Sequence, residues 1–80
     1  MAPLNLRLKK KLQDVEHSLS EAAQQLEDLN RRLSDPSLYL HQKETYETVQ
    51  THKVTQERVK TLTDSWEALA LELEELKPPA

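Results

Sequence analysis

The side chains of this 80-residue sequence that could do chemistry are three histidines and eleven lysines and arginines. An imidazole can bind zinc or transfer protons, since it titrates near neutral pH. His17, His41 and His52 do not stand in a zinc-helix pattern, so we expect no metal site. Serine, histidine and aspartate could be combined into a hydrolytic site on paper, but no walled pocket is expected to hold them. We therefore expect no catalytic residue and no enzymatic activity in this chain.

Glycine and cysteine are both absent from the sequence. The loops that cradle phosphates in dinucleotide-binding proteins and P-loop enzymes require glycine, so we expect no nucleotide cofactor and no nucleotide hydrolysis. Without cysteine the chain needs no oxidising compartment, which fits the cytoplasm. No apolar run is long enough for a membrane span or resembles a secretory signal. We expect a soluble protein with no membrane partner.

Lysine and arginine side chains could instead bind the phosphates of a nucleic acid. The candidate contacts are the basic residues in the middle of the chain, namely Arg31, Arg32, Lys43, Lys53, Arg58 and Lys60. Glutamates and aspartates lie among them, so a mixed solvated surface explains them as well as a phosphate-binding patch does. The net charge of −3 also argues against a dedicated nucleic-acid-binding protein.

The elements that must position these residues are two long helices. The first is indicated by apolar residues at alternating spacings of three and four, at Leu8, Leu12, Val15, Leu19, Ala22, Leu26, Leu29 and Leu33. This is the a/d stripe of a coiled coil. Because Pro36 cannot continue a helix and restricts the residue before it, the first helix should cover about residues 5–34.

A turn over residues 35–40 should follow. Asp35 can cap it, with Pro36 at its first position. Leu38 and Tyr39 are expected to fold back together as an apolar plug over the last core layer.

The second helix is expected over about residues 41–77, closed by Pro78 and Pro79, because no breaker interrupts it. Its C-terminal half has a clear heptad stripe: Val59, Leu62, Trp66, Leu69, Leu73 and Leu76. Extended backwards, the stripe runs through Thr55, His52, Thr48 and Thr45. Tyr46, Val49 and Val54 form a competing stripe beside it. Since β-branched threonines weaken helix propensity, the N-terminal half of this helix should be its less stable half.

Two helices joined by about six residues must be antiparallel, so we predict an all-α, single-domain fold: an antiparallel coiled-coil hairpin. One alignment of the two helices buries the apolar stripes of both. Its facing pairs are Leu33 and Thr45, Leu29 and Thr48, Leu26 and His52, Ala22 and Thr55, Leu19 and Val59, Val15 and Leu62, Leu12 and Trp66, and Leu8 and Leu69. It also brings a basic run, Arg7 with Lys9, Lys10 and Lys11, beside the acidic Glu67, Glu72, Glu74 and Glu75, and such opposite charges favour one orientation.

The turn and the tryptophan also carry a family resemblance. The run Leu33-Ser34-Asp35-Pro36-Ser37-Leu38-Tyr39, followed about thirty residues later by Trp66-Glu67-Ala68-Leu69, resembles the C-terminal coiled-coil domain of ABC-F ATPases of the Uup type. The resemblance covers roughly residues 8–76, most of it generic heptad. It implies that the chain is a domain of a longer protein, where it follows two tandem ATP-binding cassettes that hydrolyse ATP. It also implies association with the ribosome and binding of nucleic acid.

Three functions remain as alternatives. The first is a non-catalytic accessory arm that contacts DNA or ribosomal RNA through basic residues near the turn. The second is a structural module for protein–protein contact or weak self-association. The third is an RNA-binding hairpin arm like those of some aminoacyl-tRNA synthetases. Salt-dependent binding would separate the first from the second, because phosphate contacts weaken as salt rises.

Overall fold

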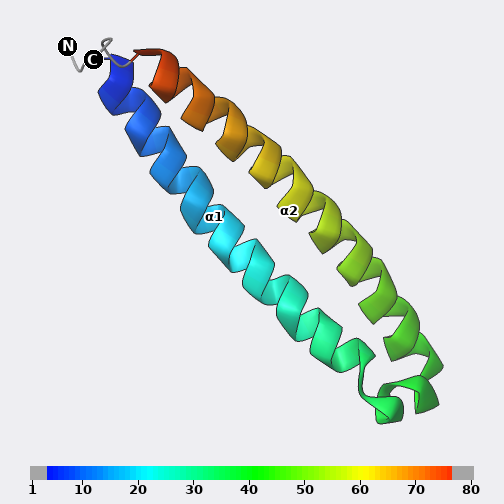
Figure 1. Cartoon of the computed structure of the whole chain (residues 1–80). Helices are drawn as coiled ribbons and strands as arrows, with labels where there is room; N and C mark the ends of the chain where they lie inside the picture. Colours follow the sequence, from blue (N-terminus) through cyan, green and yellow to red (C-terminus); the bar gives the residue numbers. More distant parts are fainter. Residues whose placement is uncertain (1–3, 77–80) are drawn as a thin grey trace.

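The computed structural model describes residues 4–76, with the side chains of residues 6–76. Helix α1 covers Leu4–Leu33, a short 3-10 helix η1 covers Pro36–Leu40, and helix α2 covers Gln42–Leu76. Figure 1 shows α1 and α2 lying side by side in opposite directions. We call the end formed by η1 the tip, and the end where α1 begins and α2 finishes the open end. The predicted all-α helical hairpin is confirmed.

The bounds of the elements follow the breakers in the sequence. Where the structure describes the chain, each bound lies within about one residue of its predicted place. The predicted last residue of the second helix, Lys77, and the closing pair Pro78 and Pro79 lie outside the described residues.

The hairpin is long and thin, with extents of 59 × 24 × 14 Å. Helices of 30 and 35 residues are about 45 and 52 Å long at a rise of about 1.5 Å per residue. With only two helices in the cross-section, each seam side chain is covered from one direction. Among the described residues Ala22 is fully buried, and no large side chain is. Stability must therefore be spread over many partly covered layers.

The seam between α1 and α2 lies where the heptads predict it. All eight predicted positions of α1 are buried or half-buried, and so are those of α2 from Thr45 to Leu73. This includes the polar positions that were predicted only by extrapolation, of which Thr48 and Thr55 are buried. The competing stripe of Tyr46, Val49 and Val54 is exposed. Burial thus confirms the predicted seam in both helices, except at Leu76, which is 44 % exposed.

The buried threonines satisfy their hydroxyl groups within their own helix. Thr48 Oγ1 donates to the carbonyl of Glu44 at 2.7 Å, and Thr55 Oγ1 donates to the carbonyl of Thr51 at 2.8 Å. A buried hydroxyl without a partner is costly, and this bond to the carbonyl four residues earlier removes that cost. Threonine can therefore occupy these buried seam positions without leaving a hydroxyl group unpaired.

Two hydrogen bonds between the helices restrict their register. His52 Nε2 lies 2.7 Å from Asn30 Oδ1, and Trp66 Nε1 donates to Glu16 Oε1 at 3.0 Å. In each bond, the residue on α1 lies one turn nearer the tip than the residue that was predicted to face its partner on α2. Helical side chains lean toward the N-terminus of their own helix, so in an antiparallel pair they meet between the levels of their Cα atoms. The register therefore agrees with the prediction to within one turn.

The seam assignment predicts unequal effects of two truncations. Leu29→Ala should lower the free energy of unfolding by about 2–5 kcal/mol, because it removes buried surface and leaves a cavity. Tyr46→Ala, at a side chain that is 66 % exposed, should change it by less than about 0.5 kcal/mol. Urea denaturation followed by circular dichroism measures both values, and equal losses would contradict the seam.

Candidate nucleic-acid interface

The tip is held by a cap on η1. Asp35 Oδ1 accepts hydrogen bonds from the backbone N–H of Ser37 at 3.0 Å and from its hydroxyl at 2.9 Å. Asp35 is the N-cap residue, and Pro36 follows it as the sequence predicts. These bonds, the backbone one first, hold the pKa of Asp35 below its ordinary value. They stabilise the carboxylate, so the tip keeps a negative charge beside its basic residues.

Leu38 and Tyr39 do not act together as the predicted plug. Leu38 is 8 % exposed and closes the core, whereas Tyr39 is 57 % exposed. The hydroxyl of Tyr39 donates to the carbonyl of Leu33 at 2.5 Å, and Leu33 is the last residue of α1. The last carbonyls of a helix have no partner within it. Tyr39 therefore caps α1 through its hydroxyl group, which corrects the prediction for this residue.

Arg31 and Arg32, the two basic residues in the last turn of α1, differ in their surroundings. Arg31 Nη2 lies 3.0 Å from Glu27 Oε1, and Arg31 Nη1 lies 3.8 Å from Asp28 Oδ1. Arg32 has no carboxylate within 4 Å among the described residues. Exposed pairs of this kind are weak, but a nearby carboxylate still lowers the positive potential that a phosphate meets. Of the two arginines, Arg32 is the better placed for an anion.

Arg32 borders two shallow hollows of the surface. One, of about 330 Å³, lies beside the seam and is also lined by Gln25, Thr51 and Thr55 among others. The other, of about 180 Å³, lies at the tip, where Ser37 and His41 share it with Arg32. Both hollows contain groups that can donate hydrogen bonds to phosphate oxygens, but each also contains a carboxylate, that of Asp28 in the first and that of Asp35 in the second.

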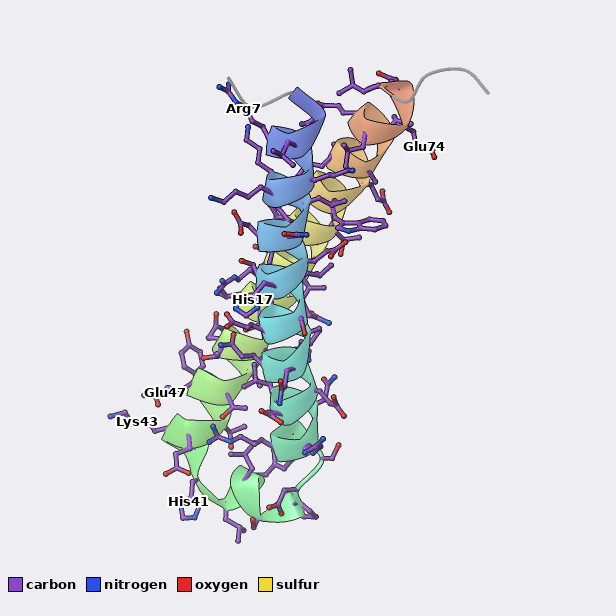
Figure 2. The ribbon with its side chains drawn as sticks, turned by 90° about the vertical axis from the view of Figure 1, so that its left-hand side faces the viewer. Arg7, His17, His41, Lys43, Glu47 and Glu74 are labelled. Carbon is purple, nitrogen blue, oxygen red and sulfur yellow. The ribbon has the colours of Figure 1, made fainter. Side chains whose placement is uncertain are left out.

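The predicted basic residues of α2 do not gather into one patch. In the heptad, Arg58 falls on the same flank of the seam as Arg32, whereas Lys53 and Lys60 fall on a stripe that turns away from α1. Lys43 also points away from α1, as Figure 2 shows. All four side chains are exposed. Of the six candidate residues, only Arg32 and Arg58 share a flank of the seam, and the other four lie on other faces of their helices.

At the open end, the expected ion pairs are not formed. Lys9, Lys10 and Lys11 lie more than 4 Å from the carboxylates of Glu67, Glu72 and Glu75. Arg7 and Glu74 lie on opposite sides of this end in Figure 2. Basic and acidic segments do share the open end, but in the described residues they do not meet as these direct pairs. Between these three lysines and Glu67, Glu72 and Glu75, the attraction therefore acts only at longer range.

Among the histidines, His17 and His52 have partners that were not predicted from the sequence. His17 Nε2 lies 3.0 Å from Oε1 of Glu21, four residues later on the same exposed face. His52 lies in the seam against Asn30, and His41 follows η1 at the tip. Over residues 6–76, no three potential ligands lie close enough together to hold a metal ion. Neither α1 nor α2 is apolar enough over its described length to cross a membrane.

Comparison with known proteins gives no match. No family model matches the sequence, no curated protein matches it, and no solved structure matches the fold.

The cap at Asp35 predicts a pH dependence of the tip. Because the folded pKa of Asp35 is lowered, its contribution to stability is complete above the ordinary value of 3.8 and is lost as the pH falls below it. Ser37→Ala removes the hydroxyl donor and leaves the backbone donor, so it should raise the pKa of Asp35 part of the way back. Carboxyl NMR titration measures this shift, with Asp64 as a reference far from the tip. An unchanged pKa would show that the hydroxyl bond is not formed in solution.

Proposed function

We propose that this chain is a non-catalytic coiled-coil arm that contacts nucleic acid, either DNA or ribosomal RNA, with its tip. The observation that carries the proposal is Arg32, a tip cation without a carboxylate partner among the described residues, which lies between two hollows with hydrogen-bond donors. His41 shares the hollow at the tip with Arg32, whereas Lys43, in the first turn of α2, points away from α1. A phosphate at the tip would meet the guanidinium group of Arg32 from one end of the turn and the imidazole of His41 from the other.

The acidic balance of the chain supports a contact confined to one region. Glu67, Glu72, Glu74 and Glu75 lie toward the open end of α2, where they would repel a phosphate backbone. A contact at the tip keeps the nucleic acid about 30 Å or more from these carboxylates, given a rise of about 1.5 Å per residue. An arm with a net negative charge can then bind by its tip without attracting nucleic acid along its whole length.

In this proposal the arm belongs to a cytoplasmic ABC-F-type ATPase. The support is the resemblance of the turn, from Leu33 to Tyr39, and of Trp66-Glu67-Ala68-Leu69 to the C-terminal domain of that family. Two features of the structure give this sequence pattern a physical role: Leu38 closes the core, and Tyr39 caps α1. The cassettes of the parent protein would hydrolyse ATP, and the hairpin would transmit their movement or position them on the nucleic acid.

A second candidate function is a protein-contact module. Tyr46 and Val54, on the outside of α2, are 66 % and 64 % exposed. Large apolar side chains at such positions favour a protein partner over a phosphate backbone.

The different surroundings of Arg31 and Arg32 allow a matched test. The isolated hairpin is titrated into labelled duplex DNA and structured RNA at two salt concentrations. We expect binding at low salt, lost on Arg32→Glu. Arg32→Ala should flatten the slope of log affinity against log salt by about one unit, as loss of one phosphate contact does. Arg31→Ala should flatten it less, because Glu27 and Asp28 already offset its charge.

Lys10→Glu at the open end is the control for a general effect of charge, and it should bind like the unmodified hairpin. If Lys10→Glu abolishes binding while Arg32→Glu does not, the contact lies at the open end. If the unmodified hairpin binds neither probe at low salt, the nucleic-acid proposal fails and the protein-contact function remains.

A further inference from the structure

The outer face of α2 near the tip carries exposed side chains that no described part of the chain covers. Its members lie at helical spacing opposite the seam: Lys43, Tyr46, Glu47, Gln50, Lys53, Val54 and Glu57. We call this set the outer patch. In Figure 2, Lys43 and Glu47 project from α2 into solvent on the side away from α1. The patch therefore faces outward along about four turns of helix.

The charges and apolar residues of the outer patch are placed so that the patch is complementary to a copy of itself running in the opposite direction. Counted outward from Gln50, Glu47 and Lys53 are each three residues away. Tyr46 and Val54 are each four away, and Lys43 and Glu57 are each seven away. Each negative charge thus mirrors a positive one, and each apolar residue mirrors another. Reversing the helix about Gln50 places unlike charges opposite each other.

We propose that the outer patch binds the outer patch of a second copy of this chain, antiparallel and about a two-fold axis at Gln50. In such an isologous contact, each pair occurs twice. Lys43 would face Glu57 of the second copy, Glu47 would face Lys53, and Tyr46 would pack on Val54. A parallel arrangement would instead place each charge opposite its own copy, so the charges select the antiparallel one.

The charges of the outer patch are available for this contact. Lys43 and Glu47 are four residues apart, as are Lys53 and Glu57, yet neither pair forms an ion pair within 4 Å. The side chains of Tyr46 and Val54 are more than three-fifths exposed. The hairpin alone thus leaves both the charges and the apolar groups of the patch in water, and the second copy would cover them together.

The dimer should be weak, and it is independent of the proposed nucleic-acid contact. From Lys43 to Glu57 the patch is about 21 Å long at about 1.5 Å per residue, which is short for an interface that normally buries about 800 Å² on each partner. Arg32 lies on a flank of the seam, outside the patch. Binding at the tip and self-association can therefore succeed or fail separately.

Charge reversal tests the two-fold pairing directly. Sedimentation equilibrium of the purified chain should show a monomer–dimer equilibrium that weakens as salt rises. Glu47→Lys should weaken the dimer roughly tenfold or more, because like charges then meet twice across the axis. Lys53→Glu should do the same. In an equimolar mixture of the two variants, the lysine introduced in one chain faces the glutamate introduced in the other, and the unchanged Lys53 and Glu47 also face each other, so a heterodimer should form.

Two controls separate this contact from other effects. Glu67→Lys reverses an exposed charge of α2 outside the patch and should leave the dimer unchanged. Circular dichroism of each variant should show an intact helical hairpin, which excludes unfolding as the cause of dissociation. The proposal is overturned if the unmodified chain remains monomeric at concentrations up to about 1 mM. It is equally overturned if the single reversals do not weaken the dimer, or if their mixture does not restore it.

Discussion

The structure depends on a seam one or two residues wide between two helices. Apart from η1 at the tip, neither helix has another element among the described residues to pack on, so the layers along the seam require side chains from both α1 and α2. This makes the register decisive, because it determines which residues are covered and which face water. A shift of α2 by rotation alone would cover Tyr46 and Val54 and expose Thr48 and Thr55, which are buried at 4 % and 6 % exposure. The register therefore determines which faces of the hairpin are exposed, and with them any function that those faces have.

Most of the fold could be predicted from the sequence because a heptad fixes one face of a helix and proline fixes its end. The leucines of α1 alone define the stripe, and Pro36 sets the tip. In α2 the stripe had to be extended through threonines against a rival apolar stripe. This extension was correct because continuity of the heptad register along α2 outweighs the hydrophobicity of the residues beside the stripe. The sequence could not show how the threonine hydroxyls are satisfied, since this depends on side-chain rotamers.

Less of the candidate site could be predicted. The types of its residues were evident, but their partners were not. Arg31 and Arg32 are adjacent in sequence, yet Arg31 lies 3.0 Å from Glu27, whereas Arg32 has no carboxylate within 4 Å in the described part of the chain. Tyr39 was expected to fold back over the last core layer with Leu38, and instead its hydroxyl donates to the carbonyl of Leu33. The bonds of Asn30 and Glu16 to α2 were also missed. Such contacts depend on the reach of single side chains, which heptad spacing does not describe.

The register of the seam is the central claim, and NMR of the labelled chain tests it most directly. Nuclear Overhauser effects between methyl groups report which side chains of the two helices touch. We expect cross-peaks between the methyl groups of Leu19 and Val59, with others from Leu19 only to residues within one turn of Val59. Cross-peaks that join Leu19 to a seam residue further along α2, or that join it to Val54 on the outer side, would contradict the register and with it the assignment of the free faces.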